Sequence, residues 1–399
     1  MTDGPRFLML VADYPWPMVS GGRVRAAGII EALRAVGSVE VLALDYASDE
    51  PAWERARAAV AARYASRRAR GRDLVLSVVH GFPTLLERSI GAGAVDAFER
   101  VMERVRPDVV VLCRPFVGPF LAVALERGTR VVVDADESLI RANRSIATSR
   151  VGLRQRVRAV VDALSAMRIE RARNPRCHQL WVSSDVERAW FLGQPTEDTV
   201  HVIRSLAPGN GTTRTSVRIT ALAFVGYYQY PPNEEAALEL MTRIAPAVRA
   251  AGGPATVHVV GRAPTDRMRR AASEHPDIRI LGEVPDSTAV IRDAGVLVVP
   301  VRSGAGTRVK VLEAMQASVP VVSTIKGVEG LAVVDKTHYL GADTPEDFAR
   351  QIRRLEGDAE LRASLTGAAR GFVEQHHSSP AVEAAVREAL AQLPGLDLG

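Results

Sequence analysis

A loop with two glycines, followed by a charged helix start, is the part of the chain best suited to bind a ligand. Residues 300–313 read PVRSGAGTRVKVLE. Gly304 and Gly306 allow a tight turn and let a ligand approach the backbone closely. The apolar pattern predicts a helix that begins near Thr307, and the free N–H groups and positive dipole end of a helix start attract an anion. The sequence therefore predicts an anion site at this loop.

Three charged side chains follow the loop at helical spacing. Arg308 and Lys310 fall in the first turn of the predicted helix, where cations oppose the helix dipole unless a ligand such as a diphosphate supplies negative charge. Glu313 lies about two turns after Gly306, where its carboxylate could accept hydrogen bonds from paired hydroxyls such as those of a ribose. The alternative is a solvated face, since Lys310 and Glu313 are three residues apart and could form a surface ion pair.

Short runs of Val, Leu and Ile alternate with longer amphipathic stretches along the chain, which predicts alternating strands and helices. Runs such as VVVLC and RVVVD are apolar at successive positions, as strands buried on both faces of a parallel sheet are. The fold class that follows is α/β, with two doubly wound, Rossmann-like domains facing a cleft. The expected strands cover residues 6–12, 39–45, 73–79, 108–113, 130–134, 178–183, 199–203, 219–226, 255–261, 278–281, 295–301 and 319–324.

Proline and glycine interrupt this alternation in RSLAPGNGTTRTSV, so the domain boundary is expected there. In open parallel sheets ligands bind beyond the carboxyl ends of the strands, so the chemistry is expected in the loops that follow strands. The predicted parts are a first domain over 1–205, a linker over 206–217, a second domain over 218–376, and a C-terminal helix over 377–399 that packs back on the first domain, with late helices at 344–356, 358–376 and 379–393.

The composition, 47% hydrophobic and 24% charged over 399 residues, is that of a globular protein and excludes a disordered or fibrous chain. Apolar runs are of strand length, too short to cross a bilayer, and the amino-terminal residues lack a signal-peptide pattern, so a cytoplasmic location is expected. Cys113 and Cys177 lack metal-ligand spacing, so reduced structural thiols are expected and a metal site is not.

The net charge of +5 is carried almost wholly by arginine, because only three of the 51 basic residues are lysines. Basic residues crowd into 55–72 and 141–173. Solvated helix faces are the simplest interpretation, although such stretches leave room for peripheral contact with an anionic membrane. Neither stretch has interleaved aromatic residues or a docking motif, so nucleic acid is not expected as a partner.

Several segments together resemble the GT-B fold glycosyltransferases of the family 4 type, also called glycosyl transferases group 1. The donor segment of that family reads as a proline, a glycine loop, K/R-x-x-E-A-M, x-G/S-x-P-V-V and G-x-E-G-L, and this chain has these features from Pro300 to Leu331. Further segments that resemble the family are FVGYYQYPPNEEAAL (224–238), VHVVGRAP (257–264), IRILGEVPD (278–286) and, near the amino terminus, DYPWPMVSGGRVRAAGIIEAL (13–33).

The resemblance implies that an NDP-sugar binds mainly to the second domain and a hydroxyl-bearing acceptor mainly to the first. It implies that Arg308 and Lys310 bind the diphosphate and that Glu313 binds the ribose hydroxyls. The implied donor-binding residues are Gly21, Gly22, Gly226, Gly304, Ala305, Gly306, Thr307 and Glu313, with Gly261, Arg262, Leu281 and Val284 beside the base.

The family resemblance also implies transfer with retention of anomeric configuration and without a metal or other cofactor. A front-face route suits this chain, because the departing phosphate oxygen can take the acceptor's proton and no protein nucleophile is needed. The expected catalytic residues are Arg308, Lys310, Asp136 and His80, with Asp13, Asp134 and Glu137 as further polar candidates at strand ends. His80 could instead be a turn histidine, and the aspartates could cap a helix.

The chain departs from the family pattern in three places. Many members have a second glutamate eight residues before the one matched by Glu313, and here that residue is Ala305. The arginine and lysine often found after the first strand of the second domain are replaced within Gly226–Tyr230. A histidine that often follows the strand at 108–113 is replaced by Cys113-Arg114-Pro115. The contacts of the donor sugar are therefore left open.

Other functions are compatible with the same fold, namely an NDP-sugar epimerase and a catalytically silent sugar-nucleotide-binding subunit. The donor could carry UDP, GDP or TDP and a hexosyl or N-acetylhexosaminyl group. The acceptor could be a small-molecule natural product, a glycolipid or a polysaccharide precursor, and the protein a monomer or a homodimer.

Overall fold

The protein divides into two compact units, each described by itself below. The computed structural model describes residues 4–11, 15–16, 18, 20–45, 62–65, 92–113, 118–149, 152–168, 170–171, 176–191, 199–208, 218–254 and 256–398. The first unit comprises Met1–Arg144, Val157–Leu206 and Ser379–Gly399, and the second comprises Ser145–Arg156 and Ala207–Ser378.

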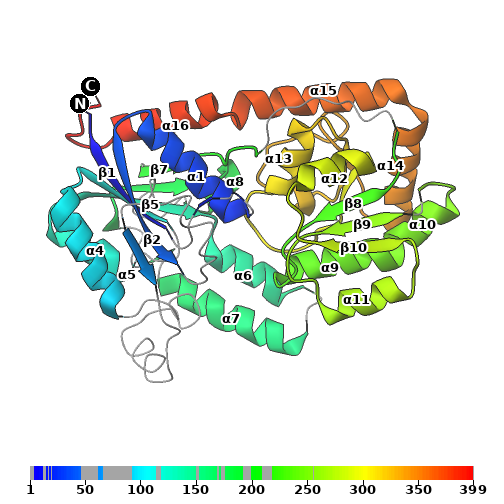
Figure 1. Cartoon of the computed structure of the whole chain (residues 1–399), viewed down its shortest axis with the longest axis horizontal. Coiled ribbons are helices and arrows are strands. Elements are labelled where there is room, and N and C mark those ends of the chain that lie inside the picture. The colour runs from blue at the N-terminus through cyan, green and yellow to red at the C-terminus, as the bar shows by residue number, and fades with distance from the viewer. Residues whose placement is uncertain are drawn as a thin grey trace. The chain divides into compact units, whose positions relative to one another are not determined.

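The first unit is built on a parallel sheet of seven strands in the order β3-β2-β1-β4-β5-β6-β7 (Figure 1). The strands are β1 (Arg6–Val11), β2 (Ser38–Asp45), β3 (Ala62–Ala65), β4 (Val109–Cys113), β5 (Arg130–Asp136), β6 (Gln179–Val182) and β7 (Val200–Val202). The helices are α1 (Gly21–Arg34), α4 (Ala92–Val105), α5 (Gly118–Glu126), α8 (Asp185–Phe191) and α16 (Ser379–Ala391), while α6 (Leu139–Ala147) and α7 (Leu153–Arg168) each have residues in both units.

Strand β1 shows why this sheet must be covered on both faces. Phe7, Met9 and Val11 belong to one buried cluster, with apolar residues of α1 and α16. Leu8 and Leu10 point to the opposite face, where they join a second cluster formed with α4, α5 and α8. Successive side chains of a strand point to opposite faces, so an uninterrupted apolar run requires helices on both sides.

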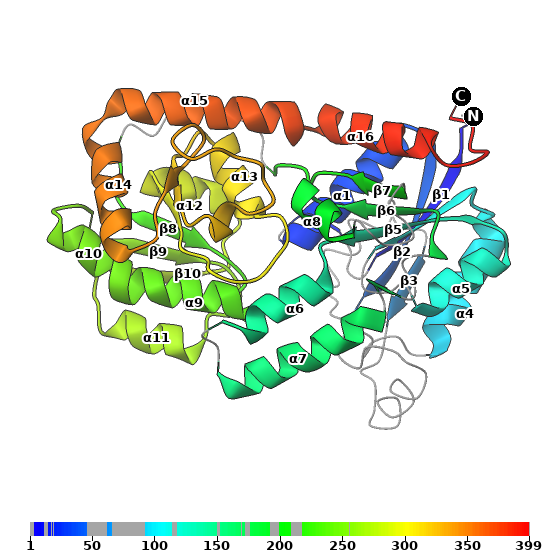
Figure 2. The same ribbon diagram turned by 180° about the vertical axis from the view of Figure 1, so that it is seen from behind.

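The second unit is built on a parallel sheet of six strands in the order β10-β9-β8-β11-β12-β13. Helices α12 and α13 lie on one side of it, and α9 and α11 on the other (Figure 2). The strands are β8 (Leu222–Val225), β9 (Val257–Val260), β10 (Ile278–Gly282), β11 (Leu297–Val299), β12 (Val321–Ser323) and β13 (Leu340–Gly341). The helical segments are α9 (Pro231–Glu239), η5 (Leu240–Ile244), α10 (Ala245–Ala250), α11 (Asp266–Ser273), α12 (Ser287–Ala294), α13 (Val309–Gln316), η6 (Lys326–Val328), α14 (Pro345–Gly357) and α15 (Ala359–His376).

The predicted α/β class with two doubly wound sheets is confirmed, and most expected strands are present within one to three residues of their predicted ends. Two strands differ from expectation. β3 lies in the basic stretch 55–72, for which the sequence favours a helix face, and the two-residue β13 has no apolar run long enough to predict it. The expected strand at 73–79 lies outside the described residues.

The C-terminal helix α16 belongs to the first unit. Its Arg387 donates a hydrogen bond from Nη2 to the carbonyl of Ala35 at the end of α1 (3.1 Å), and Gln179 of β6 donates from Nε2 to the carbonyl of Ala389 (2.5 Å). After Leu206 the chain enters the second unit, close to the proline- and glycine-rich segment.

Candidate active site

The carboxyl ends of the parallel strands β8, β9 and β10 lie side by side in the sheet of the second unit, and glycines bring the residues there into close contact. Gly226, directly after β8, donates from its N–H to the Val260 carbonyl (2.9 Å), and the Gly261 N–H donates to the Gly282 carbonyl (2.7 Å). Gly261 has φ +130°, and a Cβ placed there would lie 1.8 Å from the Gly226 carbonyl oxygen. Only glycine fits this position, so backbone contacts fix these strand ends relative to one another.

The residues expected beside the base follow these strand ends. The Arg262 guanidinium lies over the Tyr227 ring, with Cζ 5.2 Å from its centroid, and the Tyr228 N–H donates to the Arg262 carbonyl (3.1 Å). Leu281 on β10 is 40% exposed, unusual for a large apolar strand residue, and Val284 follows in the next loop. The structure thus places Arg262 against the segment after β8 and leaves Leu281 available for a ligand.

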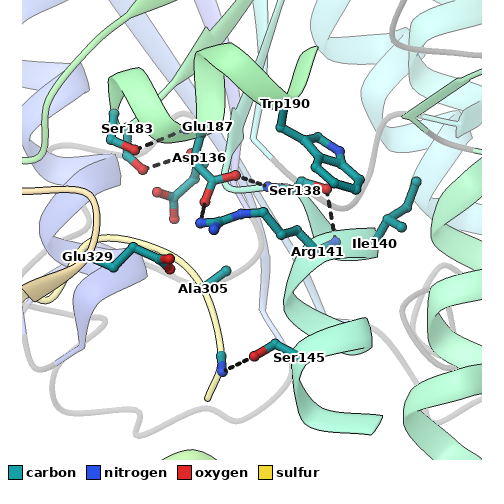
Figure 3. Close-up of polar contacts among 12 residues, drawn as sticks. Asp136, Ser138, Ile140, Arg141, Ser145, Ser183, Glu187, Trp190, Ala305 and Glu329 are labelled. Carbon is teal, nitrogen blue, oxygen red and sulfur yellow. Dashed lines mark hydrogen bonds and ion pairs between the residues drawn. The ribbon is translucent and has the colours of Figure 1, made fainter. Parts of the chain in front are cut away.

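The glycine loop follows the carboxyl end of β11, which lies on the same side of the sheet as the carboxyl ends of β8, β9 and β10. Gly304 and Gly306 have φ +90° and +85°, a backbone conformation that other residues adopt only with strain. A Cβ on Gly304 would lie 2.4 Å from the Tyr230 hydroxyl oxygen, and the Gly304 N–H donates to the hydroxyl of Ser145 in the same unit (3.0 Å; Figure 3). The predicted tight glycine turn is therefore present.

Arg308 is the residue immediately before α13, which begins at Val309 rather than near Thr307. Its side chain folds back on the loop, where Nη1 donates to the Ala305 carbonyl (3.2 Å) and Nη2 to the Ser303 carbonyl (3.4 Å). Arg308 is only 7% exposed. Its Nε and the buried Thr307 hydroxyl oxygen have no hydrogen-bond partner among the described residues. Buried polar atoms without partners are costly, so two of them at one loop make this loop a candidate site for a ligand.

Lys310, on the first turn of α13, reaches the residues that follow β8. Its Nζ donates to Asn233 Oδ1 (2.9 Å) and lies 4.2 Å from the centroid of the Phe224 ring. Burial of the amine, together with the positive charge of Arg308, lowers the pKa of Lys310 from its ordinary value of 10.5 to about 7, although Glu313 opposes this shift. The lowered pKa disfavours the charged form of the amine, and a nearby anion would favour it.

Glu313 is buried, at 9% exposure, on the face of α13 that meets the start of α12. Its Oε1 accepts hydrogen bonds from the hydroxyls of Ser287 (2.5 Å) and Thr288 (2.7 Å). Burial raises the pKa of Glu313, while these two hydrogen bonds oppose the rise. The alternative of a solvated face with a Lys310–Glu313 ion pair is wrong, because each side chain is directed to another partner inside the fold.

The segment after β12 is fixed against the end of β11. The Thr324 hydroxyl donates to the Val301 carbonyl (2.5 Å), and a Cβ on Gly327 would lie 2.6 Å from the Val299 carbonyl oxygen. Lys326 and Glu329 form an ion pair (2.5 Å) across η6. Packing therefore requires a glycine at residue 327, the first residue of the motif GVEGL (327–331). These contacts hold the loops after β11 and β12 together.

In the first unit, the two glycines of the amino-terminal motif are the first two residues of α1. Ser20 precedes them as the N-cap, and its hydroxyl accepts from the Arg23 N–H (3.4 Å). A Cβ on Gly22 would meet nothing within 4 Å, so packing in the described structure does not demand glycine there. A sterically open glycine at a helix start leaves room for close approach by a ligand.

One turn further along α1, a buried ion pair that the sequence did not reveal joins this helix to β5. Arg25 donates from Nη2 and Nε to Asp134 (2.6 Å and 3.0 Å) and from Nη1 to the Ile203 carbonyl (2.6 Å). Arg25 Nε also lies 3.7 Å from Asp136 Oδ1. Burial alone would lower the pKa of Arg25, but the charges of Asp134 and Asp136 outweigh it and raise the pKa.

Asp136 ends β5 with φ +57°, a left-handed conformation that costs energy for a residue with a side chain. Its carbonyl accepts from both the N–H and the hydroxyl of Ser183 (2.8 Å each), which holds the strained backbone in place. Such strain is typical of residues positioned for function. Asp136 is thus placed as a candidate, while His80, Asp13 and Arg114 lie outside the described residues.

The start of α6, just after Asp136, is held by two buried carboxylates (Figure 3). Glu187 accepts from the Ser138 N–H (2.8 Å) and pairs with Arg141, and Glu170 accepts from the Ser138 hydroxyl (2.7 Å) and the Ile140 N–H (3.1 Å). Burial raises the pKa of both glutamates, against the hydrogen bonds that they accept. Carboxylates at a helix start interact favourably with its dipole, so this arrangement fixes the loop that carries Asp136.

Both cysteines are free and buried, as the sequence predicts. Burial raises the pKa of the Cys177 thiol to about 12 and that of the Cys113 thiol well above its ordinary value. Neither thiol has the depressed pKa of a reactive nucleophile.

A family model for glycosyl transferases group 1 matches residues 220–358, which are the strands and helices that carry the glycine loop, Arg308, Lys310 and Glu313. The second unit is a glycosyltransferase group 1 domain. The resemblance found in the donor segment is thereby confirmed for this domain. A comparison of the sequence with curated proteins gives no match.

The whole chain shares its fold with solved GT-B glycosyltransferases. HepE from Anabaena, in complex with UDP and glucose, aligns with a TM-score of 0.66 at 12% identity, covering 98% of this chain and 100% of that one. A TarM variant from S. aureus, in complex with Fondaparinux, alpha-GlcNAc-glycerol and UDP, aligns with a TM-score of 0.70 at 10% identity over 96% and 99%. Sucrose-phosphate synthase from Thermosynechococcus elongatus gives 0.66 at 15% identity over 97% and 99%. The predicted GT-B fold is therefore confirmed.

In the described part of the chain, the structure contains no helix that is both long enough and apolar enough to cross a membrane.

Proposed function

We propose that this glycosyltransferase transfers a sugar from a nucleotide diphosphate to an acceptor hydroxyl, with retention of configuration and without a metal ion. The main observation is the positively charged loop at the start of α13, which contains buried polar atoms without hydrogen-bond partners among the described residues. Arg308 Nε and the Thr307 hydroxyl are buried without described partners, and Lys310 is a buried amine beside them. A diphosphate would supply acceptors for these donors and negative charge for the two cations.

These side chains are suited to stabilise a leaving nucleoside diphosphate. As the bond to the sugar breaks, negative charge grows on the phosphate oxygens while the sugar gains positive charge. Arg308 can donate hydrogen bonds to those oxygens, and Lys310 gains a full positive charge when the anion raises its pKa from about 7. Because two protein cations neutralise the leaving group, we propose that the reaction needs no divalent ion.

The acceptor's proton is proposed to pass to the departing phosphate oxygen, on the same face of the sugar that the acceptor attacks. This route requires no protein nucleophile, and it gives retention of configuration. Asp136 is the polar candidate of the first unit, where its strained backbone and the Arg25 ion pair hold it in place. We propose that the first unit binds the acceptor and that the enzyme acts in the cytoplasm.

Glu313 is proposed to bind the ribose hydroxyls. Ser287 and Thr288 donate to one of its oxygens, which orients the carboxylate and leaves acceptor capacity for two further hydroxyl donors. Arg262 with Tyr227 and the exposed Leu281 offer a cation–aromatic pair and an apolar contact suited to a base.

The donor sugar is proposed to be a hexose or N-acetylhexosamine carried by UDP. HepE is solved with UDP and glucose, and TarM with alpha-GlcNAc-glycerol and UDP, and both share this fold. Ala305 is buried and offers no carboxylate to the sugar. The hydroxyls of the sugar must therefore be recognised by backbone groups of the loop or by other residues. The acceptor class is proposed to be a small-molecule natural product, a glycolipid or a polysaccharide precursor.

The test is donor binding and turnover by the full chain and two matched arginine variants. UDP, GDP and TDP are titrated by calorimetry, and UDP-glucose and UDP-GlcNAc are then supplied with a panel of hydroxyl acceptors, with the anomeric configuration of any product read by NMR. Arg308→Gln should weaken diphosphate binding about ten- to a hundredfold, because a hydrogen bond to a charged group contributes about 1.5–3 kcal/mol.

Arg302→Gln is the control, because Arg302 lies in the same loop but is 45% exposed and pairs with Glu239 (2.8 Å). It should change binding by less than about threefold. Equal binding by Arg308→Gln and the parent protein would contradict the site. Binding without sugar transfer to any acceptor would favour a silent subunit, and conversion of the NDP-sugar alone would favour an epimerase.

A further inference from the structure

Helix α7 carries a stripe of large apolar side chains that face solvent. The exposed fractions are 78% for Leu153, 56% for Val157, 49% for Val160, 42% for Val161 and 60% for Leu164. Their spacing of i, i+4, i+7, i+8 and i+11 places all five on one face of the helix. They account for five of the eleven exposed large apolar side chains among the described residues.

The opposite face of α7 explains how the helix stays attached to the protein. Ala159, Ala163 and Ala166 are buried, at 4%, 8% and 0% exposure, so the helix packs through small side chains. An ordinary surface helix does the reverse, with its large apolar residues inside. A contiguous apolar patch of this kind marks an interaction surface.

Arginines border the apolar stripe. By helical geometry Arg154 and Arg158 lie on one side of it and Arg156 on the other, and all three are exposed. Asp162, the single acidic residue in the sequence of α7, pairs with Arg158 (3.7 Å). The helix therefore presents an apolar face with a positive border.

We propose that α7 docks this glycosyltransferase on an anionic membrane surface. The leucines and valines would lie at the boundary of headgroups and acyl chains, while the arginine stems extend along that boundary and their guanidinium groups bind lipid phosphates. Charge complementarity favours this occupant over a second copy of the chain, because pairing two such helices would bring like-charged arginine borders together. The proposal does not depend on the donor chemistry.

The first test measures binding of the full chain to vesicles of phosphatidylcholine alone and of phosphatidylcholine with 30 mol% phosphatidylglycerol. We expect co-sedimentation with the anionic vesicles and little with the neutral ones, falling as salt is raised. The variant Arg154→Gln/Arg156→Gln/Arg158→Gln should bind anionic vesicles on the order of a hundredfold more weakly, since each arginine near such a surface changes affinity about fivefold.

The matched control is Arg269→Gln/Arg270→Gln/Arg279→Gln, which removes the same charge from three exposed arginines of the second unit, on α11 and β10. It should keep binding within about threefold of the parent protein. Equal losses in the two triple variants would mean that only net charge matters, and would overturn the proposal.

The second test reports the environment of the stripe itself. Because Cys113 and Cys177 are buried, an NBD probe can be attached selectively to Leu164→Cys, with Val334→Cys as the control at an exposed site, 55% accessible, in the second unit. NBD emission should rise and shift to the blue with anionic vesicles at 164 only.

An unchanged probe at 164 on vesicle-bound protein would overturn the proposal. So would a dimer in light scattering that Val157→Gln/Leu164→Gln dissociates, in a protein that binds neither kind of vesicle, because the occupant would then be a second copy.

Discussion

Replacing Lys310 with methionine should stabilise the ligand-free protein while it weakens diphosphate binding. A pKa that falls from 10.5 to about 7 corresponds to ~5 kcal/mol of lost preference for the charged amine. Part of the side chain is still accessible to water, and the variant loses the hydrogen bond to Asn233 and the contact of the ammonium with Phe224. We therefore expect a net gain of about 2 kcal/mol for Lys310→Met near pH 6.5.

The pH dependence of this gain follows from the direction of the shift. Below about pH 7 the amine is protonated in both the folded and the unfolded chain, so the full cost of burying the charge is present. Between about 7 and 10.5 the unfolded chain binds more protons, so the stability of the parent protein rises with pH relative to the variant. Urea unfolding of both proteins at pH 6.5 and pH 9 should show the advantage of Lys310→Met shrinking at the higher pH.

Diphosphate binding should show the opposite dependence. A bound anion favours the charged amine, so binding above pH 7 requires uptake of a proton, and the affinity of the parent protein for UDP should fall by up to about tenfold per pH unit. Calorimetry in buffers of different ionisation enthalpy measures that proton uptake directly. Lys310→Met should bind more weakly at pH 6.5 and show a flat profile up to pH 9.

The control for Lys310→Met is Lys336→Met. Lys336 is exposed, so its replacement should leave both stability and UDP affinity unchanged within about 0.5 kcal/mol. The reasoning would be refuted if Lys310→Met were less stable than the parent protein at pH 6.5, or if its effect on stability were the same at pH 6.5 and pH 9.

Three further substitutions test separate parts of the structure. Glu313→Gln should weaken UDP binding roughly tenfold but leave binding of inorganic pyrophosphate unchanged, because only the nucleoside has ribose hydroxyls. Equal losses of affinity for the two ligands, measured by calorimetry, would contradict the assignment of Glu313 to the ribose. Asp134→Asn should lower the free energy of unfolding by about 3–5 kcal/mol in a urea titration, since Arg25 would keep its buried charge without its main partner. The control is Glu103→Gln, which breaks the exposed ion pair with Arg127 and should cost less than about 1 kcal/mol in the same titration. Gly261→Ala should lower the thermal midpoint far more than Gly252→Ala, because a Cβ at 261 meets the Gly226 carbonyl whereas one at 252 meets nothing within 4 Å; similar midpoints would contradict the described contact.

The fold was predictable from sequence because its strands are buried on both faces. Runs such as VVVLC contain no polar residue, and only a covered parallel sheet accommodates them. β3 was not predictable in this way, since Ala62–Ala65 reads ARYA within a stretch rich in arginine and alanine. β3 lies at the edge of the sheet, where a strand pairs on one side only and need not have the uninterrupted apolar run of a strand buried on both faces.

The residues proposed for the donor half of the candidate site were identifiable from the sequence, because one continuous segment contains these glycines, cations and the carboxylate. The contacts that those side chains make in the fold were not. Lys310 reaches Asn233, and Glu313 reaches Ser287 and Thr288, across sequence separations that no local spacing encodes. Asn233 is part of the YPPN segment that resembles the family, which is the signal that pointed to its region without giving its role.

Arg25 shows the same limit in the first unit. In sequence it is one of two arginines in GGRVRAAG, and nothing local separates it from Arg23. Packing of α1 separates them, because residues 24–30 are all buried whereas Arg23, in the first turn, is only partly buried. A charge in that position needs a buried partner, which the end of β5 supplies as Asp134.

Arg25 and Lys310, two cations packed inside the described part of the chain, therefore differ in whether the fold satisfies them. Arg25 has two carboxylates within 4 Å, and its pKa is raised, so its charge is neutralised within the first unit. Lys310 has only an amide oxygen and a ring face as described contacts, and its pKa is lowered. The first cation thus has a carboxylate partner and the second has none among its described hydrogen bonds, which agrees with the proposal that Lys310 binds an external anion. Under the proposed function, a bound diphosphate would restore the stability lost at Lys310, so gain of stability and loss of binding should occur in the same variant.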